Sequence, residues 1–542
     1  MALIDFKVLP GIDKQNTDSG AEFRWIDSDN VRFRYGLPEK VGGWSSLVTD
    51  TIVGVSRKMH AFVDLDGNRY VAIGTDKFLL LYFEGQLFDI TPVKAVINSA
   101  TIATTINSAT CTITTSGAHG INVGDIVQFN NVTLPGGTGY ANSDFEDKNF
   151  QVITVPSTTT FTITQSSNAT ATVSTGGSIQ LIPYEPVGPA AQSYGYGWGI
   201  DTWGAGNWGE AASASNVSLE PGLWSLDNFG EVLIATVANG KTFTWNAGAA
   251  SATSNRASTA TSGFATGNNP TASRLTLVSP TTRHLCHFGT ETTIGSSSTQ
   301  DDMFIRFSDQ EDINDYTATS INSAGDFRLQ DGTKIMGALK AKESILVWTD
   351  NALYTMKFVG APFTFGFEQV GTNCGLIGKN AAVEIDGVAF WMSPNGFFMF
   401  DGTVKSLPCS VEDFVYDSAD TTKGQQVIAG LNNLFTEVVW YYPSTNSDYN
   451  DKYVVFNYGE TMKGGVWYIG TEARTSWIDA VVYPKPFGTK FDINSTGTFP
   501  AVVGQTGLGQ TILFEHEVGT DQVNPDGTTT TVTSFVKSYD FD

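Results

Sequence analysis

The sequence has few of the residues on which disulfide formation, metal binding or catalysis usually depends. Its 542 residues include four cysteines and five histidines. Cys111, Cys286, Cys374 and Cys409 show no C-x-x-C spacing and are too sparse to cross-link a chain of this length. We therefore expect four buried free thiols, which suits assembly in a reducing cytoplasm.

Long hydrophobic runs are also missing. No apolar stretch approaches the roughly 20 residues of a transmembrane helix. The first residues, MALIDFK, lack the basic and apolar regions of a signal peptide. The sequence therefore predicts no insertion into a membrane and no export by the usual route.

Positive charge is scarce. Lys and Arg total 31 against 55 Asp and Glu, which gives a formal net charge of -24. A protein that grips DNA statically needs cationic groups to displace counterions from the phosphates, so tight non-specific DNA binding is not expected. The excess of acidic residues either keeps the protein soluble or gives it a surface that repels nucleic acid, and the sequence leaves both possibilities open.

Catalytic motifs are not found. There is no G-x-S-x-G, no H-E-x-x-H and no P-loop, because residues 375–380 (GLIGKN) lack its spacing and its Ser or Thr. His284, Cys286 and His287 suggest zinc, but a strand would place them on two faces and no second pair is near. Asp64 and Asp66 fit a hairpin turn better than a calcium loop. We expect no enzyme, no cofactor and no metal.

Aromatic residues and glycine are plentiful instead. The sequence has 35 Phe, 18 Tyr, 12 Trp and 56 Gly, a composition that favours pleated sheets joined by tight turns. Residues 58–92 form one strand-turn-strand unit, and similar units recur at 223–247, 334–370, 381–408 and 437–470. The later units fall at a spacing of roughly 40–50 residues, which is that of propeller blades. The prediction is an all-β, propeller-like array of four-stranded antiparallel blades with an inserted small β domain; a pair of β-sandwiches is the alternative.

The predicted organisation has six parts. Segments 232–235, 345–348, 388–391 and 454–456 are predicted as inner strands of the blades, because their apolar residues align. The parts are a leader with an entry strand (1–57), a first blade (58–94), an inserted Thr/Ser-rich β domain (95–183), a Gly/Trp-rich loop (184–222), the remaining blades (223–515) and a C-terminal strand segment (516–542).

Candidate contact residues lie in the Gly/Trp-rich loop. Alternating glycine and aromatic residues cannot bury a core of their own, while Trp and Tyr are effective interface anchors. The loop packs either on a neighbouring subunit or partner or on its own propeller, and the sequence does not decide between them. The candidates are Tyr194, Tyr196, Trp198, Trp203 and Trp208.

The leader raises a second electrostatic question. Val31, Phe33 and Tyr35 alternate with Arg32 and Arg34 at the period of a half-buried strand. The two arginines form either a salt-bridged or solvated strand face or, less commonly, a pair that faces phosphate.

Several stretches, taken in order, resemble the tail nozzle proteins of short-tailed bacteriophages, also described as tail tubular protein B or packaged-DNA stabilisation proteins. Three of them lie in the second half of the chain: residues 344–402 (from SILVWTDN to FFMFDG), 410–415 (SVEDFV) and 436–444 (TEVVWYYPS), with Trp467 and Trp477 downstream. The fourth is the leader NVRFRYGLPEKVGGW at 30–44, which is similar to the family's entry into the first blade. Residues 95–183 lie outside this resemblance and are similar to small decoration domains of viral structural proteins. The family pattern would place at least one more strand after Asp542, so the chain continues or the last sheet closes differently.

The resemblance implies a structural protein of the virion tail, assembled in the host cytoplasm. It implies a homohexameric ring that lies beneath a tail adaptor protein and is surrounded by tail fibres or spikes. This ring would retain packaged double-stranded DNA and conduct it during ejection. The acidic composition fits this role, since a basic lumen would hold DNA back. Two alternatives remain. One is a carbohydrate-binding adhesin or lectin whose loop aromatics stack on sugars. The other is a propeller glycosidase, although this sequence lacks the Ser-x-Asp-x-Gly-x-x-Trp turns that are common in sialidase-type propellers.

Overall fold

The chain folds into a β-propeller with an inserted β domain, as predicted. The computed structural model describes residues 8–192, 220–259, 269–460 and 465–539. Within these ranges nearly all regular structure is strand, and the helices are one α-helix, α1 (Glu412–Ser418), and short 3-10 turns. The 3-10 turns are η1 (Asn142–Asp144), η3 (Ala252–Ser254), η4 (Ser297–Thr299) and η5 (Thr421–Gln426).

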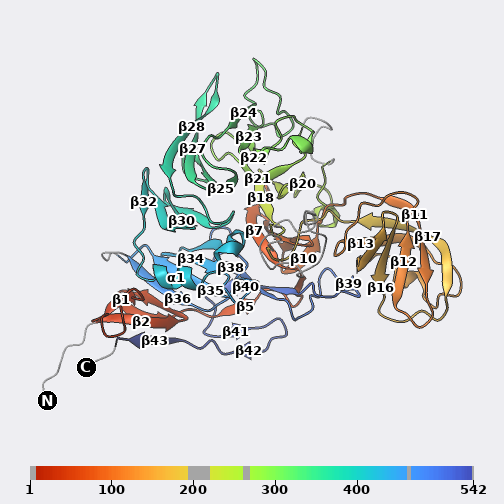
Figure 1. The fold of residues 1–542 in the computed structure, drawn as a ribbon, viewed down its shortest axis with the longest axis horizontal. Coiled ribbons are helices and arrows are strands. Elements are labelled where there is room, and N and C mark those ends of the chain that lie inside the picture. Colours follow the sequence, from red (N-terminus) through yellow and green to blue (C-terminus); the bar gives the residue numbers. More distant parts are fainter. Residues whose placement is uncertain (1–7, 193–219, 260–268, 461–464, 540–542) are drawn as a thin grey trace, which may run out of the picture.

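Seven small sheets of the described residues form the blades of the propeller, which Figure 1 shows arranged around a common centre. Each blade is antiparallel and follows the chain from its innermost strand outward. Blade 1 is β7 (Ser56–Val63), β8 (Arg69–Thr75), β9 (Leu79–Phe83) and β10 (Gln86–Asp89). Blade 2 is β18 (Trp224–Phe229), β19 (Val232–Val237) and β20 (Thr242–Asn246). Blade 3 is β21 (Ser273–Val278), β22 (Leu285–Thr290), β23 (Phe304–Phe307) and β24 (Gly325–Arg328).

The second half of the ring is built in the same way. Blade 4 is β25 (Ile335–Lys340), β26 (Ile345–Thr349), β27 (Ala352–Gly360) and β28 (Thr364–Thr372). Blade 5 is β29 (Ala382–Ile385), β30 (Val388–Ser393), β31 (Gly396–Phe400) and β32 (Val404–Ser406). Blade 6 is β33 (Ile428–Asn432), β34 (Glu437–Tyr442), β35 (Lys452–Asn457) and β36 (Val466–Gly470). Blade 7 begins with β37 (Ser476–Ile478), β38 (Phe487–Asp492) and β40 (Gln510–His516).

The innermost strands close into a ring. Strands β7, β18, β21, β25, β29, β33 and β37 contact one another in that order, and β37 returns to contact β7. A pair of β-sandwiches would have no such cycle, so the sandwich alternative is excluded. Stacking the blades in a ring buries both faces of each sheet and leaves only short edges.

The seventh blade is completed by the start of the chain. Strand β5 (Trp44–Ser46) pairs antiparallel with β40, and β6 (Ile52–Val53) pairs with the same strand. The leader therefore supplies the outer strand of the last blade before the chain enters the first blade at β7.

The inner strands of the blades lie where they were predicted. Segments 232–235, 345–348, 388–391 and 454–456 lie in four separate sheets, in β19, β26, β30 and β35, which are second or third strands. The middle of a blade is covered by neighbouring blades on both faces, so its strands are the most apolar. An innermost strand faces the axis with one side, and its polar residues there hide it from a search for apolar alternation.

Three tryptophans, two of them buried and one half-buried, join neighbouring blades. The indole Nε1 of Trp224 in blade 2 donates to the Thr75 carbonyl of blade 1 at 2.8 Å. Trp440 in blade 6 donates to the carbonyl of Ala381 beside blade 5 at 3.1 Å. Trp477 in blade 7 donates to Leu431 of blade 6 at 2.7 Å. A buried indole needs an acceptor, and each of these finds one on the preceding blade, so the apolar packing and the blade order are fixed together.

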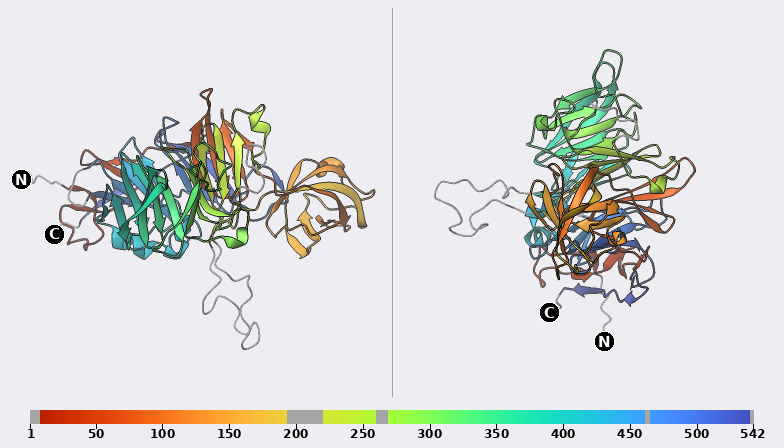
Figure 2. Two further views of the ribbon diagram at one scale, coloured as in Figure 1. Left: turned by 90° about the horizontal axis from the view of Figure 1, so that it is seen from above. Right: turned by 90° about the vertical axis from the view of Figure 1, so that its right-hand side faces the viewer.

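The inserted domain follows blade 1 and has its own core. Its buried residues, among them Val127, Phe129, Phe150 and Ile163, pack with one another rather than with the blades. It projects from one side of the propeller in Figures 1 and 2, and β39 (Val502–Val503) of the blade 7 region adds to its sheet in parallel. Its strands are β11 (Ile97–Thr104), β12 (Thr110–Thr114), β13 (Ile126–Thr133), β14 (Lys148–Gln151), β15 (Thr154–Ser157), β16 (Thr160–Thr164) and β17 (Val173–Pro183).

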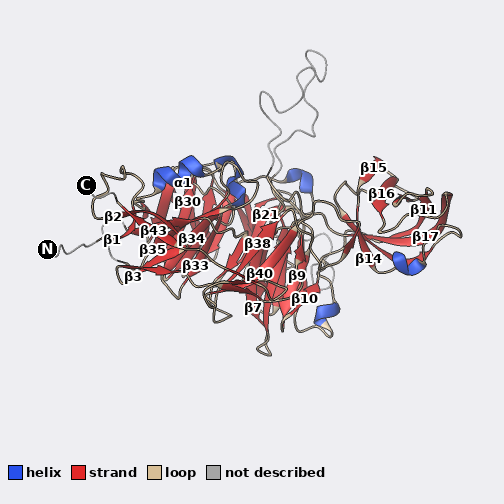
Figure 3. Ribbon diagram, turned by 90° about the horizontal axis from the view of Figure 1, so that it is seen from below, coloured by secondary structure: helices blue, strands red, loops and turns tan. Residues whose placement is uncertain are grey.

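A small module near both chain ends lies on the opposite side of the propeller, as seen from above in Figure 2 and from below in Figure 3. Here the first and last parts of the described chain pair, since β2 runs antiparallel to β43. We refer to these strands together as the terminal module. They are β1 (Leu9–Ile12), β2 (Arg24–Asp29), the hairpin β3 (Val31–Arg34) and β4 (Leu37–Lys40), and β43 (Phe535–Ser538); β41 (Gln522–Val523) and β42 (Thr529–Thr530) extend blade 7 beside it.

Candidate functional site

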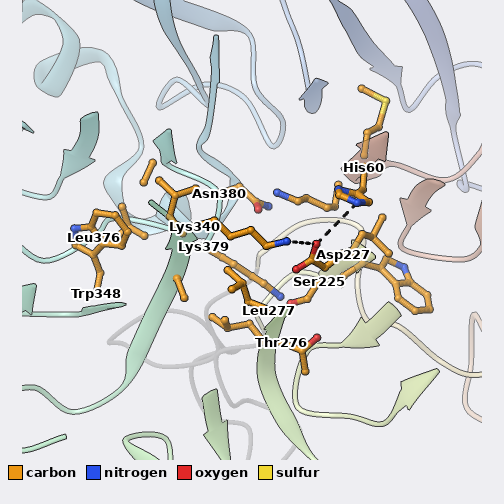
Figure 4. Close-up of a pocket in the computed structure, with 18 residues that line it drawn as sticks. His60, Ser225, Asp227, Thr276, Leu277, Lys340, Trp348, Leu376, Lys379 and Asn380 are labelled. Carbon is orange, nitrogen blue, oxygen red and sulfur yellow. Dashed lines mark hydrogen bonds and ion pairs between the residues drawn. The ribbon is translucent and has the colours of Figure 1, made fainter. Parts of the chain in front are cut away.

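The propeller axis contains two adjoining cavities, of ≈ 240 Å³ and ≈ 330 Å³. The first lies between β7, β18, β21, β25 and the segment leading into β29; the second lies between β7, β29, β33 and β37. Lys58, His60 and Asn380 line both. The two cavities therefore form one axial site, which we call the axial cavity, and Figure 4 shows its first part.

One carboxylate dominates the first part of the axial cavity. Asp227 of β18 accepts a hydrogen bond from Lys340 of β25 at 2.6 Å, and Figure 4 shows the two side chains meeting across the gap. Its other oxygen accepts the backbone N–H of Val278 at 2.7 Å. The Nε2 atom of His60 lies 4.0 Å away, and burial lowers the pKa of this imidazole, so His60 is neutral at pH 7. Asp227 is thus already paired.

Two further lysines in the cavity have no carboxylate partner. Among the described residues, the Lys58 ammonium makes no hydrogen bond or ion pair, and Lys379 donates only to the carbonyl of Arg274, at 3.2 Å. Burial lowers the pKa of both groups, to about 7 for Lys379, where Lys58 and Arg274 repel its charge further. Glu220 acts on Lys379 only from a distance, because it pairs with Arg274 and Lys334.

Arg57 is buried beside the second part of the cavity. Its guanidinium donates to the Ala190 carbonyl at 2.6 Å and to Gln426 Oε1 at 2.5 Å. Its Nε and Nη1 atoms are buried without a partner, and burial lowers its pKa to about 10. A buried, incompletely bonded guanidinium is costly.

The charges in the second part are balanced, since Glu384 and Asp479 line it together with Arg57 and Lys58. Both carboxylates accept backbone N–H groups: Glu384 from Gly387 at 2.6 Å, and Asp479 from Ala480 at 2.7 Å and from Asn433 at 3.3 Å. Burial raises the pKa of the Asp479 carboxyl.

The first part differs, because three lysines line it against the single carboxylate of Asp227. It therefore has an excess of positive charge, although the chain as a whole carries -24.

The contact candidates of the Gly/Trp-rich loop, Tyr194, Tyr196, Trp198, Trp203 and Trp208, lie outside the described residues. The other sequence candidates are placed clearly. Both ring nitrogens of His287 face hydroxyls, those of Ser273 at 2.8 Å and Tyr316 at 3.0 Å. His284 likewise meets Thr282 at 2.7 Å and Ser323 at 2.9 Å. In the part of the chain that the structure describes, no three His, Cys, Asp or Glu residues gather as metal ligands.

The remaining carboxylate and arginine candidates have local roles. Asp64 closes the β7–β8 turn by accepting the N–H groups of Asp66 at 3.0 Å and Asn68 at 2.8 Å. Arg32 is buried between Glu437, at 3.1 Å, and Glu517, with its guanidinium 3.5 Å from the centre of the Phe435 ring. It belongs to a buried ion-pair network, so of the two interpretations the salt-bridged strand face holds.

The described tryptophans are covered. Of these, Trp25 and Trp477 are half-buried and the others are buried. A lectin that stacks sugars on tryptophan needs an exposed indole face. Among the described tryptophans, Trp25 and Trp477 are partly exposed, and Trp477 lines the second part of the axial cavity. Among the helices that the structure describes, none has the length and apolar character needed to cross a membrane.

Sequence reasoning missed the axial cavity. Lys379 lies in GLIGKN, whose spacing does not fit a phosphate-binding loop. Its glycines serve packing instead: a Cβ on Gly378 would lie 2.1 Å from the Gly424 carbonyl, and one on Gly375 would lie 2.2 Å from that of Asp350. The available signal was a charged residue within the first strand of a blade, such as Lys58 in β7 and Asp227 in β18.

No protein-family model and no curated protein matches the sequence. Among solved structures, the computationally designed Ika8 protein is 8% identical, with a TM-score of 0.35 over 88% of this chain and 99% of that one. Phage phi92 endosialidase is 12% identical (TM-score 0.19; 93% and 67% covered), and an ancestral GH74 enzyme is 9% identical (TM-score 0.26; 93% and 77%). Similarity this low carries no functional argument, and the propeller assignment rests on the strand pairing above.

Proposed function

We propose that this chain is a structural component of a short-tailed phage tail. In this proposal six copies form the ring-shaped nozzle that retains packaged DNA and conducts it during ejection. The ring binds the tail adaptor protein above and fibre or spike proteins around it, and belongs to the virion after assembly in the host cytoplasm. The role is mechanical and involves no enzymatic step.

The observation that carries the proposal is the two-sided shape of the subunit. The inserted domain and the terminal module project from opposite sides of the propeller (Figures 1 and 2). Identical subunits close into a ring when two different surfaces of each subunit meet head to tail. A propeller with a distinct module on each side offers such a pair of surfaces.

Exposed apolar residues on the terminal module support its use as a contact. Tyr35 and Leu37, at the β3–β4 turn, are 83% and 69% exposed, and Phe23 and Phe535 are about half exposed. Apolar side chains gathered at one end of a molecule favour a protein contact there. The segments that resemble the nozzle family lie mainly in blades 4 to 6, adjacent to this module.

In this proposal DNA passes between subunits and not along the axis of a propeller. The axial cavities measure ≈ 240 Å³ and ≈ 330 Å³ and are crossed by side chains such as Lys340 and Asp227. A duplex about 20 Å wide cannot enter them, and their lysines would hold its phosphates. The overall charge of -24 suits a lumen along which DNA slides.

Measurement of the assembly state tests the proposal. We expect native mass spectrometry and negative-stain class averages to show sixfold rings, alone or on the adaptor ring. Tyr35→Asp with Leu37→Asp should prevent ring formation while leaving the monomer folded. The matched control is Leu65→Asp, which is 86% exposed on the β7–β8 turn of the propeller and should not affect assembly. A chain that stays monomeric in the presence of the adaptor ring would refute the proposal.

A second experiment addresses the lumen. Once the ring is imaged, two or three acidic residues at its narrowest point are replaced by lysine. We expect slower DNA release from assembled particles at low salt, because each cation adds a phosphate contact, and recovery at high salt, where such contacts are screened. Unchanged DNA release at low salt would show that the acidic lumen does not help DNA to slide, and that the acidic composition serves solubility only.

A further inference from the structure

Among the described residues, the axial cavity brings together two lysines without a hydrogen-bonded carboxylate and one hydroxyl without a hydrogen-bond partner. Lys58 comes from blade 1, Ser225 from β18 of blade 2 and Lys379 from the segment that leads into blade 5. The Ser225 side chain is buried at 5% exposure, and its hydroxyl has no hydrogen-bond partner among the described residues. Figure 4 shows Lys379 and Ser225 directed toward the same space beside Asp227.

This arrangement is costly without a ligand. Two ammonium groups that repel each other sit in a cavity walled by Leu277, Leu339 and Leu376. Asp227 attracts Lys58 but is hydrogen-bonded to Lys340. Glu220 attracts Lys379 but is paired with two other cations. Buried charges are normally paired, and a buried hydroxyl normally has a hydrogen-bond partner.

We propose that Lys58, Lys379 and Ser225 bind a small multivalent oxyanion in the axial cavity. Two ammonium groups neutralise a dianion through charge-assisted hydrogen bonds, and the serine hydroxyl donates a third bond. The first part of the cavity, at ≈ 240 Å³, accommodates a phosphate or a small polycarboxylate. The bound anion joins blades 1, 2 and 5 across the axis.

The charges that face Lys379 give the site a pH dependence. Lys58 of β7 and Arg274 of β21 repel its ammonium, and Glu220 attracts it weakly. Lys340 and Asp227 form a neutral pair, and His60 is uncharged at pH 7. Because an anion favours the charged amine, binding at pH 8 takes up a proton at Lys379, and affinity falls as the pH rises above 7.

Calorimetry and thermal unfolding of the full chain, with inorganic phosphate as the first probe, test this inference. We expect saturable binding that raises the melting temperature, and heats at pH 8 that depend on the ionisation enthalpy of the buffer. Lys58→Met and Lys379→Met should each weaken binding roughly tenfold or more, and Ser225→Ala roughly threefold. The matched control is Lys342→Met, an exposed lysine on the β25–β26 turn, which should bind like the wild type.

Comparing the binding of citrate and chloride with that of phosphate shows which class of anion the site prefers. Tighter binding of citrate identifies a polycarboxylate site, tighter binding of phosphate identifies a phosphate site, and chloride should compete weakly with both. The quantity compared is the ligand-induced shift within each variant, so a change in the stability of the ligand-free protein does not obscure it. An equal shift in the wild type, Lys58→Met and Lys379→Met, or no shift with either oxyanion, would overturn the inference.

Discussion

Trp44 and His516 are paired residues of strands β5 and β40, although they come from opposite ends of the chain. Their rings lie 5.6 Å apart, and the Trp44 indole donates to Gln522 Oε1 at 2.9 Å. This contact closes the seventh blade and therefore the propeller. The strand that completes this blade, β5, is only three residues long.

The first prediction concerns this closure. Trp44→Ala should lower the free energy of unfolding by about 3–5 kcal/mol, because it removes a buried aromatic side chain and leaves a cavity. Chemical denaturation followed by intrinsic fluorescence measures the change. Leu65→Ala, at a residue that is 86% exposed, is the control and should change stability by no more than about 0.5 kcal/mol. A comparably small loss for Trp44→Ala would mean that β5 is not needed to hold the ring.

The second prediction concerns the inserted domain. Its two connections lie side by side, since Val93 and Tyr184 are bridge partners and the Lys94 N–H donates to the Pro183 carbonyl at 2.9 Å. Replacing residues 95–183 with a short Gly/Ser linker should leave the propeller folded, because closing such a short gap costs little entropy.

Differential scanning calorimetry tests the deletion. We expect the propeller transition to persist at a slightly lower temperature, since β39 loses its pairing with β14 and Ala501 loses its hydrogen bond from Asn149. A variant that keeps the domain but carries Asn149→Ala separates loss of this contact from loss of the domain. Disappearance of all cooperative unfolding on deletion would show that the domain is part of the propeller core.

The third prediction is acid sensitivity at His287. Burial lowers the pKa of this imidazole to about 3 from the ordinary 6.5, so the unfolded chain binds a proton there that the folded chain does not. The resulting stabilisation is fully present above pH 6.5 and is lost as the pH falls toward 3. His287→Gln should therefore lose less stability than the wild type between pH 6.5 and 4, measured by urea denaturation. Parallel pH profiles for the two proteins would contradict the assignment.

These features differ in how far the sequence could reveal them. Segments such as 345–348 (ILVW) and 388–391 (VAFW) predicted separate blades because a strand covered on both faces is continuously apolar. Strand β5 (WSS) is too short to give a periodic signal, and its partner lies at the other end of the chain, so the closure could not be predicted. The axial cavity escaped for a related reason: Lys58, Ser225 and Lys379 are ordinary polar residues in sequence, and only ring closure brings their strands together.

The last prediction is that the axial lysines reduce the stability of the ligand-free protein. Lys379 has a pKa of about 7 in the folded chain against 10.5 when unfolded, so folding disfavours its charged form. The loss of folding stability that this causes is fully present below pH 7 and disappears as the pH rises to 10.5 and above.

The variant Lys379→Met tests this prediction, because it keeps the apolar stem and removes the charge. It should raise the free energy of unfolding by roughly 1–3 kcal/mol at pH 6 in buffer without oxyanions. The gain should shrink as the pH approaches 10, and Lys342→Met should show no gain at either pH. Saturating phosphate should narrow the difference at pH 6, because the wild type then has a partner for its ammonium. A Lys379→Met protein that is less stable than the wild type at pH 6 would contradict this prediction, because it would show that the amine stabilises the ligand-free fold.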